Sequence, residues 1–206
     1  MVISKEDLTR IEKAVEAAES HTLGEIVPVI ALQSDSYSGA VWRFAALFAL
    51  LSGALIYRFL LIDYPFYSFA LQLPALAIGY GLARWAPLKR HLTSHYEMGK
   101  AFHHRAFQAF HEHGLHRTEK ETGVLIFVSI FERKACVLAD RGILEKLHQK
   151  DWEAILEKLL GQIKNGHLTE GLVQAIEAVG QKLAEHFPAS GAHKNQLSNH
   201  VSVEKE

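Results

Sequence analysis

Cysteine, net charge and the short motifs of nucleotide-dependent enzymes are all scarce in this chain. Its 206 residues include one cysteine, Cys136, so an intramolecular disulfide framework is excluded, in agreement with a reducing cytoplasm. The formal net charge of −1 gives no electrostatic basis for binding nucleic acid. The sequence contains no P-loop, dinucleotide-binding fingerprint, nucleophile elbow or Ser/His/Asp motif. We therefore expect neither a nucleic-acid partner nor an organic cofactor.

Two long apolar runs dominate the middle of the chain. They cover residues 41–62 and 66–86, and Asp63-Tyr64-Pro65 joins them. Each run is about 20 residues long, and a helix of that length spans a hydrocarbon core of about 30 Å. The sequence therefore predicts a two-helix transmembrane hairpin over residues 41–88. The alternative is a buried helical hairpin in a soluble protein, although the runs have no polar face to turn to water.

Charged residues fall where a membrane hairpin tolerates them. Four basic residues, Arg43, Arg84, Lys89 and Arg90, flank the open ends of the hairpin, whereas Arg58 lies near its closed tip. The positive-inside rule then places both termini in the cytoplasm. Residues 1–20 have the pattern of a charged amphipathic helix and not of a signal peptide, so we expect no export of the domain. The expected partners are the lipid bilayer and a membrane protein, or a second copy of the chain.

The remaining sequence predicts one α/β domain that the hairpin interrupts. β-branched and apolar runs predict strands at residues 25–32, 124–131 and 135–139, of which the last two form an antiparallel hairpin. A connection through a helix favours parallel pairing of the first two strands, and Pro28 places the first strand near an edge or a bulge. Periodic apolar positions predict helices over residues 4–20, 92–115, 152–163 and 168–187.

These elements predict an α/β fold, in which a small mixed sheet is layered with helices as α/β/α. The two parts of the domain are expected at residues 1–40 and 89–188. Residues 189–206 are rich in Ser, His, Lys and Asn, which predicts a flexible C-terminal tail.

Three segments resemble the TPM-domain family. They are HTLGEIVPVIALQSDSY at residues 21–37, LHRTEKETGVLIFVSIFERKACVLADRGI at 115–143 and NGHLTEGLVQAIEAVGQKLAEHFP at 165–188. The chain is most similar to the bacterial branch in which a two-helix membrane hairpin interrupts the domain, so the resemblance implies the plasma (inner) membrane of a bacterium. It also implies an α/β/α fold. Some plant relatives are described as acid phosphatases, and an animal relative acts as an auxiliary subunit of a receptor channel.

The sequence departs from the phosphatase-like branch at two places. Paired aspartates precede the first helix in that branch, but this chain has Val2-Ile3-Ser4-Lys5 there. Asp140-Arg141-Gly142-Ile143 stands where that branch has a Tyr-Gly-Leu turn. Both departures favour a non-catalytic interaction or an assembly and maintenance role at the membrane. The alternative is a metal-assisted phosphatase, in which Asp140, Asp151 and Glu170 gather Ca²⁺ or Mg²⁺.

Each candidate carboxylate also has a structural interpretation. Asp140 suits a cation site or a tight turn with Gly142, and the turn is favoured. Asp151 suits a metal cluster or the first turn of a helix, and capping is favoured. Glu170 belongs, with Arg117, to motifs that resemble the family's, and both residues suit a structural role as well.

Histidine is concentrated between His91 and His116, where seven of the thirteen histidines lie. The spacing of His111, His113 and His116 permits zinc or nickel binding. The alternative is the solvated face of a helix close to a membrane, which we favour because no cysteine or recognised carboxylate motif accompanies these residues.

Overall fold

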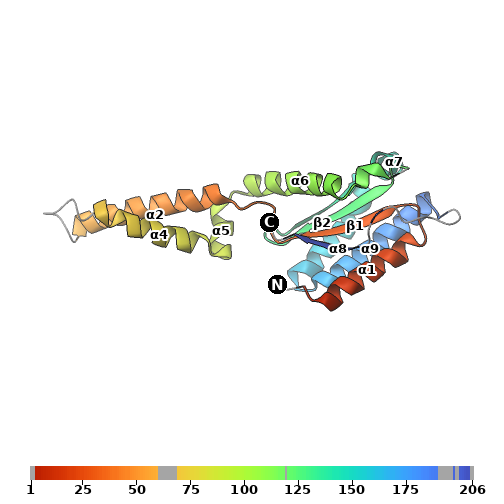
Figure 1. Ribbon diagram of the computed structural model, residues 1–206, viewed down its shortest axis with the longest axis horizontal. Coiled ribbons are helices and arrows are strands. Elements are labelled where there is room, and N and C mark those ends of the chain that lie inside the picture. The colour runs from red at the N-terminus through yellow and green to blue at the C-terminus, as the bar shows by residue number, and fades with distance from the viewer. Residues whose placement is uncertain (1–2, 60–68, 119, 190–196, 198–199, 205–206) are drawn as a thin grey trace. The chain divides into compact units, whose positions relative to one another are not determined.

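The computed structural model describes residues 3–59, 69–118, 120–189, 197 and 200–204 (Figure 1). The chain divides into two compact units. The first unit combines Met1–Ser34 with Ala101–Glu206, and the second unit is Asp35–Lys100. Each unit is described by itself below.

The first unit contains a mixed sheet in the order β3-β2-β1-β4 over the residues described. Its strands are β1 (Glu25–Ala31), β2 (Gly123–Ser129), β3 (Lys134–Ala139) and β4 (Ser202–Glu204). β1 pairs in parallel with β2 and with β4, and β2 pairs antiparallel with β3. The predicted α/β class, the parallel pair and the antiparallel hairpin are therefore confirmed. β4 is a strand that the sequence did not predict, because three residues with a polar first and last position give no apolar run.

Pro28 lies in β1 and has no backbone N–H to donate. At its position this loss does not break a hydrogen bond between β1 and the short strand β4. Backbone N–H groups of a parallel strand point alternately to its two neighbours. The N–H of Glu25 donates towards β2, to Thr122, and that of Leu32 donates towards β4, to Glu204. Pro28 falls on the β4 side by this alternation, and β4 pairs only with residues from Val29 onward. Pro28 predicted a strand near an edge or a bulge, but β1 lies between β2 and β4, and only its first half, which includes Pro28, is unpaired on the β4 side among the described residues.

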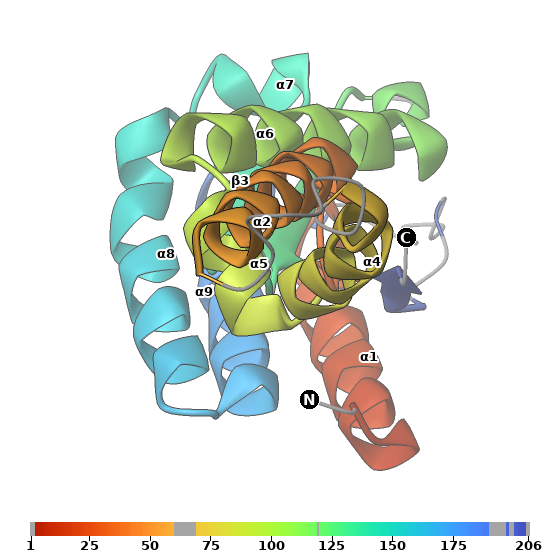
Figure 2. The ribbon, with the colours of Figure 1, turned by 90° about the vertical axis from the view of Figure 1, so that its left-hand side faces the viewer.

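Helices cover both faces of the sheet, as Figures 1 and 2 show. One apolar cluster joins the sheet to α1 (Lys5–Glu19), α8 (Gln149–Lys164) and α9 (Leu168–His186). A second cluster joins the opposite face to the Phe102–Phe110 part of α6 (His95–Glu112) and to Leu115 in the short helix η1 (Leu115–Arg117). The four-residue helix α7 (Arg141–Leu144) follows β3. The unit is therefore layered as α/β/α, with β1 and β2 buried along their whole length.

Local hydrogen bonds explain where several helices begin. α1 starts at a capping box in which the Ser4 hydroxyl accepts the Asp7 N–H at 3.1 Å and the Asp7 carboxylate accepts the Ser4 N–H at 3.2 Å. α6 starts in the same way, between Ser94 and Glu97. The helix predicted over residues 92–115, with Thr93 or Ser94 as its cap, begins at His95, and Ser94 is its cap. Extended backbone at Thr93 separates α6 from the preceding helix α5 (Ala86–Leu92).

The second unit is built on two antiparallel helices, α2 (Ser38–Phe59) and α4 (Gln72–Ala83). Gly53 of α2 lies against the Gln72 side chain, whereas Gly79 of α4 lies against Ala45 and Phe48, so the chains run in opposite directions. The buried residues recur four positions apart on each helix. They are Val41, Ala45, Ala49 and Gly53 on α2, and Ala75, Gly79 and Ala83 on α4, and Ala40 beside Val41 is buried as well.

Candidate functional site

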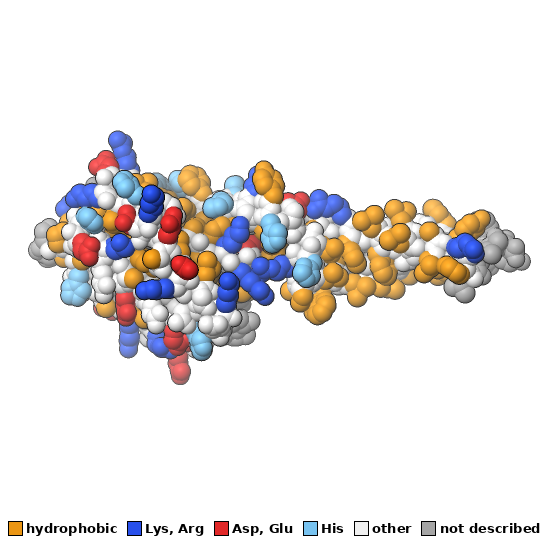
Figure 3. Space-filling view, turned by 180° about the vertical axis from the view of Figure 1, so that it is seen from behind, with side chains coloured by type: hydrophobic (Ala, Val, Ile, Leu, Met, Phe, Trp, Pro, Cys, Tyr) orange, Lys and Arg blue, Asp and Glu red, His pale blue; other side chains and the backbone are white. Residues whose placement is uncertain are grey.

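The outer surface of the α2/α4 pair is apolar, whereas small residues fill its interior. An added Cβ at Gly79 would lie 3.1 Å from the Ala45 Cα atom, so the two backbones approach closely. Figure 3 shows apolar side chains spread over the surface of these helices. The exposed large side chains are Trp42, Leu47, Leu50, Leu51, Leu55, Tyr57 and Phe59 on α2, and Leu73, Ile78 and Leu82 on α4. This arrangement is the reverse of a water-soluble helix pair, which buries its large apolar side chains.

α2 is the one helix in the described part of the chain that is long and apolar enough to cross a membrane. Its 22 residues give a length of about 33 Å, close to the hydrocarbon thickness of a bilayer. α4 is described over 12 residues, and the predicted link Asp63-Tyr64-Pro65 and the start of the second run at Phe66 lie outside the described residues. The structure therefore supports one candidate span, and the two-helix transmembrane hairpin stays a prediction.

Asp140 lies at the end of β3 and caps α7. Its Oδ1 atom accepts the Arg141 N–H at 2.8 Å, and its own N–H donates to the Gly123 carbonyl. The next turn is tight, because an added Cβ at Gly142 would lie 2.6 Å from the Lys120 carbonyl oxygen. The favoured reading of Asp140-Arg141-Gly142 as a structural turn agrees with this geometry. The Asp140 Oδ2 atom is buried and has no hydrogen-bond partner in the described part of the chain.

Asp151 of α8 pairs with Lys182 in the last turns of α9, whereas Glu170 lies in the first turn of α9 and pairs with Arg10. Asp151 accepts the His148 N–H at 2.7 Å, which caps α8, and lies 3.8 Å from Lys182. Glu170 lies 3.1 Å from Arg10 of α1. The rise along α9 from Glu170 to Lys182 is roughly 18 Å. Two carboxylates that share one cation each place an oxygen about 2.4 Å from it, so their oxygens lie within about 5 Å of one another. The two carboxylates therefore do not meet.

The environments of these carboxylates favour their charged forms. The pKa of Asp151 is lowered, first by the backbone N–H of His148 and then by Lys182 and nearby histidines, against a smaller opposing effect of desolvation. The pKa of Glu170 is lowered by its own backbone N–H and by Arg10. These are the effects of helix capping and of surface ion pairs, so they give no sign of a proton-transfer group.

The three candidate histidines do not converge. The His111 and His116 rings stack with centroids 5.0 Å apart, and His111 Nδ1 lies 2.9 Å from the Phe107 carbonyl oxygen. His113 lies apart from this stack, with Nε2 at 4.0 Å from Glu204. Stacked rings do not aim two nitrogens at one ion about 2.0 Å away. Among the described residues, no group of three His, Cys, Asp or Glu side chains is arranged to hold a metal ion.

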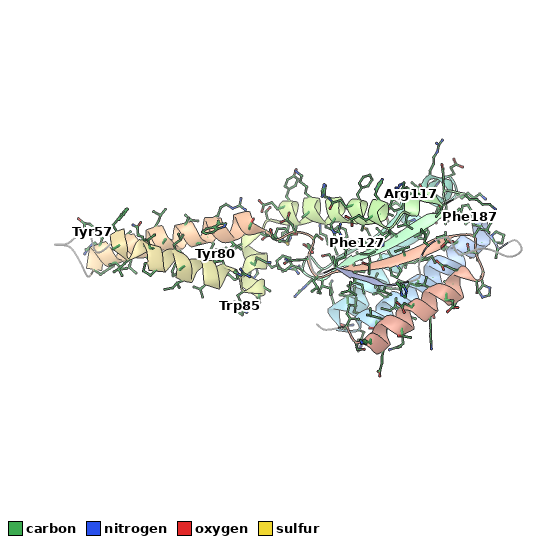
Figure 4. The ribbon with its side chains drawn as sticks, viewed as in Figure 1. Tyr57, Tyr80, Trp85, Arg117, Phe127 and Phe187 are labelled. Carbon is green, nitrogen blue, oxygen red and sulfur yellow. The ribbon has the colours of Figure 1, made fainter. Side chains whose placement is uncertain are left out.

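Phe107 extends the histidine stack into an exposed patch on the first unit. The Phe107 side chain is 61% exposed, and its ring lies 4.4 Å from that of His111. Arg117, labelled in Figure 4, donates from Nε to His116 at 3.3 Å. We refer to Phe107, His111 and His116 as the aromatic patch. The sequence gives no sign of this surface, because a phenylalanine in an amphipathic helix, such as Phe107, is expected to pack into the core.

Two further ionic contacts were not apparent in the sequence. Arg105 of α6 binds both oxygens of Glu204 in β4, and Glu132 accepts the Ser34 N–H at 2.9 Å and a hydrogen bond from Ser129. Burial acts to lower the pKa of Arg105, but Glu112 and Glu204 outweigh it and raise the pKa. Arg105 and Glu204 are 99 positions apart and Ser34 and Glu132 are 98 apart, and sequence spacing gives no signal for contacts at such separations.

The layered fold defines the class, an α/β/α domain interrupted by a second unit. Residues 93–182 match the family described as TPM domain, so the resemblance is confirmed over this part of the chain. Among solved structures, the NMR structure of the BA42 protein from the psychrophilic bacterium Bizionia argentinensis is similar, with a TM-score of 0.62 and 20% identity. The similarity covers 98% of this chain and 96% of that one, and at this identity it bears on the fold. No curated protein matches the chain.

Proposed function

We propose that this chain is a two-pass integral membrane protein of a bacterial plasma membrane. In this arrangement the α2/α4 pair spans the bilayer, and the TPM-like α/β domain lies in the cytoplasm together with both termini. The domain serves a non-catalytic role and docks a membrane-protein partner during assembly or maintenance.

The inverted packing of α2 against α4 carries the membrane assignment. Burying one large apolar side chain stabilises a protein by about 1.5–3 kcal/mol, so a soluble helix pair that left ten exposed would be strongly disfavoured in water. In lipid the same side chains have an apolar solvent, and close packing through small residues drives association. Tyr57 and Trp85 lie at opposite ends of the pair in Figure 4, as expected for aromatic residues at two interfaces.

Single-cysteine labelling tests both the membrane span and its direction. Cys136 is buried, so new cysteines are introduced at exposed positions, Arg58→Cys near the tip of α2 and Ser36→Cys before its start. With an impermeant maleimide, we expect labelling of Arg58→Cys in intact cells and of Ser36→Cys only after lysis. A chain recovered in the soluble fraction after alkaline washing, with both sites protected in intact cells, would contradict the proposal.

The polar contacts of the first unit support a docking role over a catalytic one. Asp151 and Glu170 are occupied by helix capping and by ion pairs that hold helices together. The aromatic patch, by contrast, is exposed and has a rigid stacked geometry suited to a protein interface, where aromatic anchors dominate binding.

Site-specific photo-crosslinking tests the docking role. A photoreactive phenylalanine analogue replaces Phe107, and the matched control places it at the exposed Lys158 of α8. We expect a discrete crosslinked membrane-protein product at position 107 that disappears when His111 is changed to Ala. Equal products from both positions, or none at position 107, would count against the aromatic patch as the docking surface.

One observation favours the phosphatase alternative, namely the buried and unpartnered Oδ2 atom of Asp140. A carboxylate oxygen without a hydrogen-bond partner among the described residues can act as a cation ligand, and Ca²⁺ and Mg²⁺ are the ions that prefer such oxygens. The test is hydrolysis of a phosphate monoester by the purified chain with either ion present, using Asp140→Asn, which retains a capping side chain. We expect no activity above the Asp140→Asn background. Activity that this substitution removes would establish the alternative.

A further inference from the structure

Arg117 differs in its surroundings from the paired arginines of this chain. Four arginines form an ion pair with a glutamate, namely Arg10, Arg43, Arg105 and Arg141. Arg117 is exposed at the end of η1, and no carboxylate lies within ion-pair distance of it in the part of the chain that the structure describes. It contacts His116 instead, to which its Nε atom donates at 3.3 Å. The positive charge of this guanidinium is therefore not balanced within the described first unit.

The hydrogen bond to His116 determines which side of the guanidinium stays available. A guanidinium carries its N–H donors in a planar fork, and Nε of Arg117 uses its single N–H on His116. The two terminal nitrogens carry the remaining donors, and side by side they match the two oxygens of a carboxylate. Because His116 accepts at Nε2, its neutral ring keeps the proton on Nδ1. His116 thus orients Arg117 so that the two terminal nitrogens are left for a ligand.

The same histidine connects Arg117 to an exposed apolar ring. His116 stacks on His111, and Nδ1 of His111 donates to the Phe107 carbonyl, so short contacts within the first unit hold the aromatic patch in place. The Phe107 ring lies against His111 on the other side and is exposed. The surface therefore offers a large apolar ring and an unpaired cation, joined by two stacked imidazoles. Aromatic residues and arginine are the residue types that are enriched at protein interfaces and dominate their binding energy.

We infer that the aromatic patch and Arg117 together bind an acidic segment of the partner protein, with an apolar side chain against Phe107 and an Asp or Glu carboxylate on Arg117. The inference rests on the proposed docking role and names the chemistry of the partner at that same surface. A carboxylate complements the charge of Arg117 and can accept from both terminal nitrogens at once. A basic segment would place like charge beside Arg117, which weakens binding.

Binding of two matched peptides to the full-length chain in a non-ionic detergent tests this chemistry. The peptides are N-acetyl-Phe-Asp-amide and N-acetyl-Phe-Asn-amide, which differ in a carboxylate against a neutral amide. A trifluoromethyl-phenylalanine at position 107 reports binding through its fluorine NMR signal. We expect the aspartate peptide to bind about fivefold more tightly, the upper range for an exposed ion pair. Arg117→Gln should abolish this ratio, whereas the control Arg133→Gln, at an exposed arginine in the turn between β2 and β3, should keep it.

The His116→Phe variant separates the orientation of Arg117 from its charge. A phenyl ring can stack on His111 as the imidazole does, but it accepts no hydrogen bond from Arg117. We expect the ratio between the two peptides to fall to about twofold, because the charge remains while the fork is no longer oriented. A ratio that stays at about fivefold would show that His116 does not position Arg117.

The outcomes separate this inference from the docking role on which it rests. Equal binding of the two peptides, or a photo-crosslinked product from position 107 that persists unchanged in Arg117→Gln, would overturn the inference and leave the docking role intact. Tighter binding of inorganic phosphate than of the aspartate peptide would also overturn it, since the ligand would then be a soluble anion. A preference for the aspartate peptide without any crosslinked product from position 107 would instead refute the docking role and leave the carboxylate chemistry of the site in place.

Discussion

Arg105 of α6 and Glu204 of β4 form a two-pronged ion pair. The Nε atom of Arg105 lies 2.9 Å from Oε2, and one terminal nitrogen lies 2.7 Å from Oε1. The side chains are 23% and 14% exposed, so this pair is better shielded from water than the surface pairs Arg10–Glu170 and Arg43–Glu97. Because β4 makes only a three-residue ladder with β1, this contact is a large part of what holds the strand to the sheet.

Replacing Glu204 with Gln should loosen β4. The substitution retains shape but removes the charge from two hydrogen bonds, and we expect a loss of about 1–2 kcal/mol in the free energy of unfolding. Urea unfolding of the detergent-solubilised chain, followed by Trp152 fluorescence, measures the change. The control is Glu153→Gln at an exposed position of α8, and equal stability of the two variants would refute the role of the pair.

Gly79 and Gly81 offer a matched test of the helix pair. A side chain at Gly79 meets the Phe48 Cβ atom at 3.0 Å and the backbone of Ala45, whereas an added Cβ at Gly81 has no neighbour within 4 Å in the described structure. Gly79→Leu should therefore separate α2 from α4 and Gly81→Leu should not. Trp42 emission reports the separation, because this ring lies against Tyr80, with centroids 4.8 Å apart, only while the helices are packed. An unchanged spectrum in Gly79→Leu would exclude close packing at this point.

Acid should destabilise the first unit through its capping carboxylates. The pKa of Asp7 is lowered mainly by hydrogen bonds from Ser4, and that of Asp151 by the His148 N–H, from an ordinary value of 3.8 for both. A carboxyl with a lower pKa in the folded chain than in the unfolded chain stabilises the fold above the ordinary value. That stability is lost as the pH falls through the lowered pKa. Unfolding midpoints measured between about pH 6 and pH 2 should fall most steeply below about pH 4, and Asp151→Asn should make the fall shallower. A fall equally steep in Asp151→Asn would show that this cap contributes nothing.

The thiol of Cys136 should be unreactive while the chain is folded. Burial in β3 raises its pKa to about 12, so the thiolate that alkylating reagents need is scarce at neutral pH. Iodoacetamide should therefore modify Cys136 only as fast as the chain unfolds. Mass spectrometry measures the modified fraction over time at increasing urea concentrations. A cysteine placed at the exposed Lys158 serves as the fast-reacting control. Rapid native modification of Cys136 would contradict its buried placement.

The predictable part of the fold is the part that local patterns specify. The apolar runs of β1 and β2 and the Ser4–Asp7 capping box identify their elements without tertiary information, because strand burial and helix initiation are local. β4 could not be found in this way, since its place depends on the distant Arg105 and on the free edge of β1. The cap of α6 at Thr93 or Ser94 was predicted from the local pattern, because the hydrogen bonds between Ser94 and Glu97 are local, whereas the seven-residue helix α5 before it was not predicted as a separate element.

Candidate site residues were less predictable, for a geometric reason. Asp140 and Asp151 were correctly weighed as turn and cap residues, because both roles involve only neighbouring backbone groups. The spacing of His111 and His113 suggested a cluster, but residues two apart on a helix point in different directions, and His113 lies near Glu204 while His111 stacks on His116. The separation of Asp151 from Glu170 depends on how α8 packs along α9, which places Asp151 beside Lys182 and which the two predicted helices do not specify.

The placement of the second unit between β1 and α6 has a consequence for biosynthesis. β1 pairs with β2 in a register that joins Glu25 to Gly123, and β2 leaves the ribosome only after the whole of Asp35–Lys100 has been made. The first strand therefore waits, with its apolar residues unshielded by a sheet, throughout translation of the intervening helices. Nascent α1 and β1 thus need protection from aggregation, and the slow step in maturation is the late closure of this long loop.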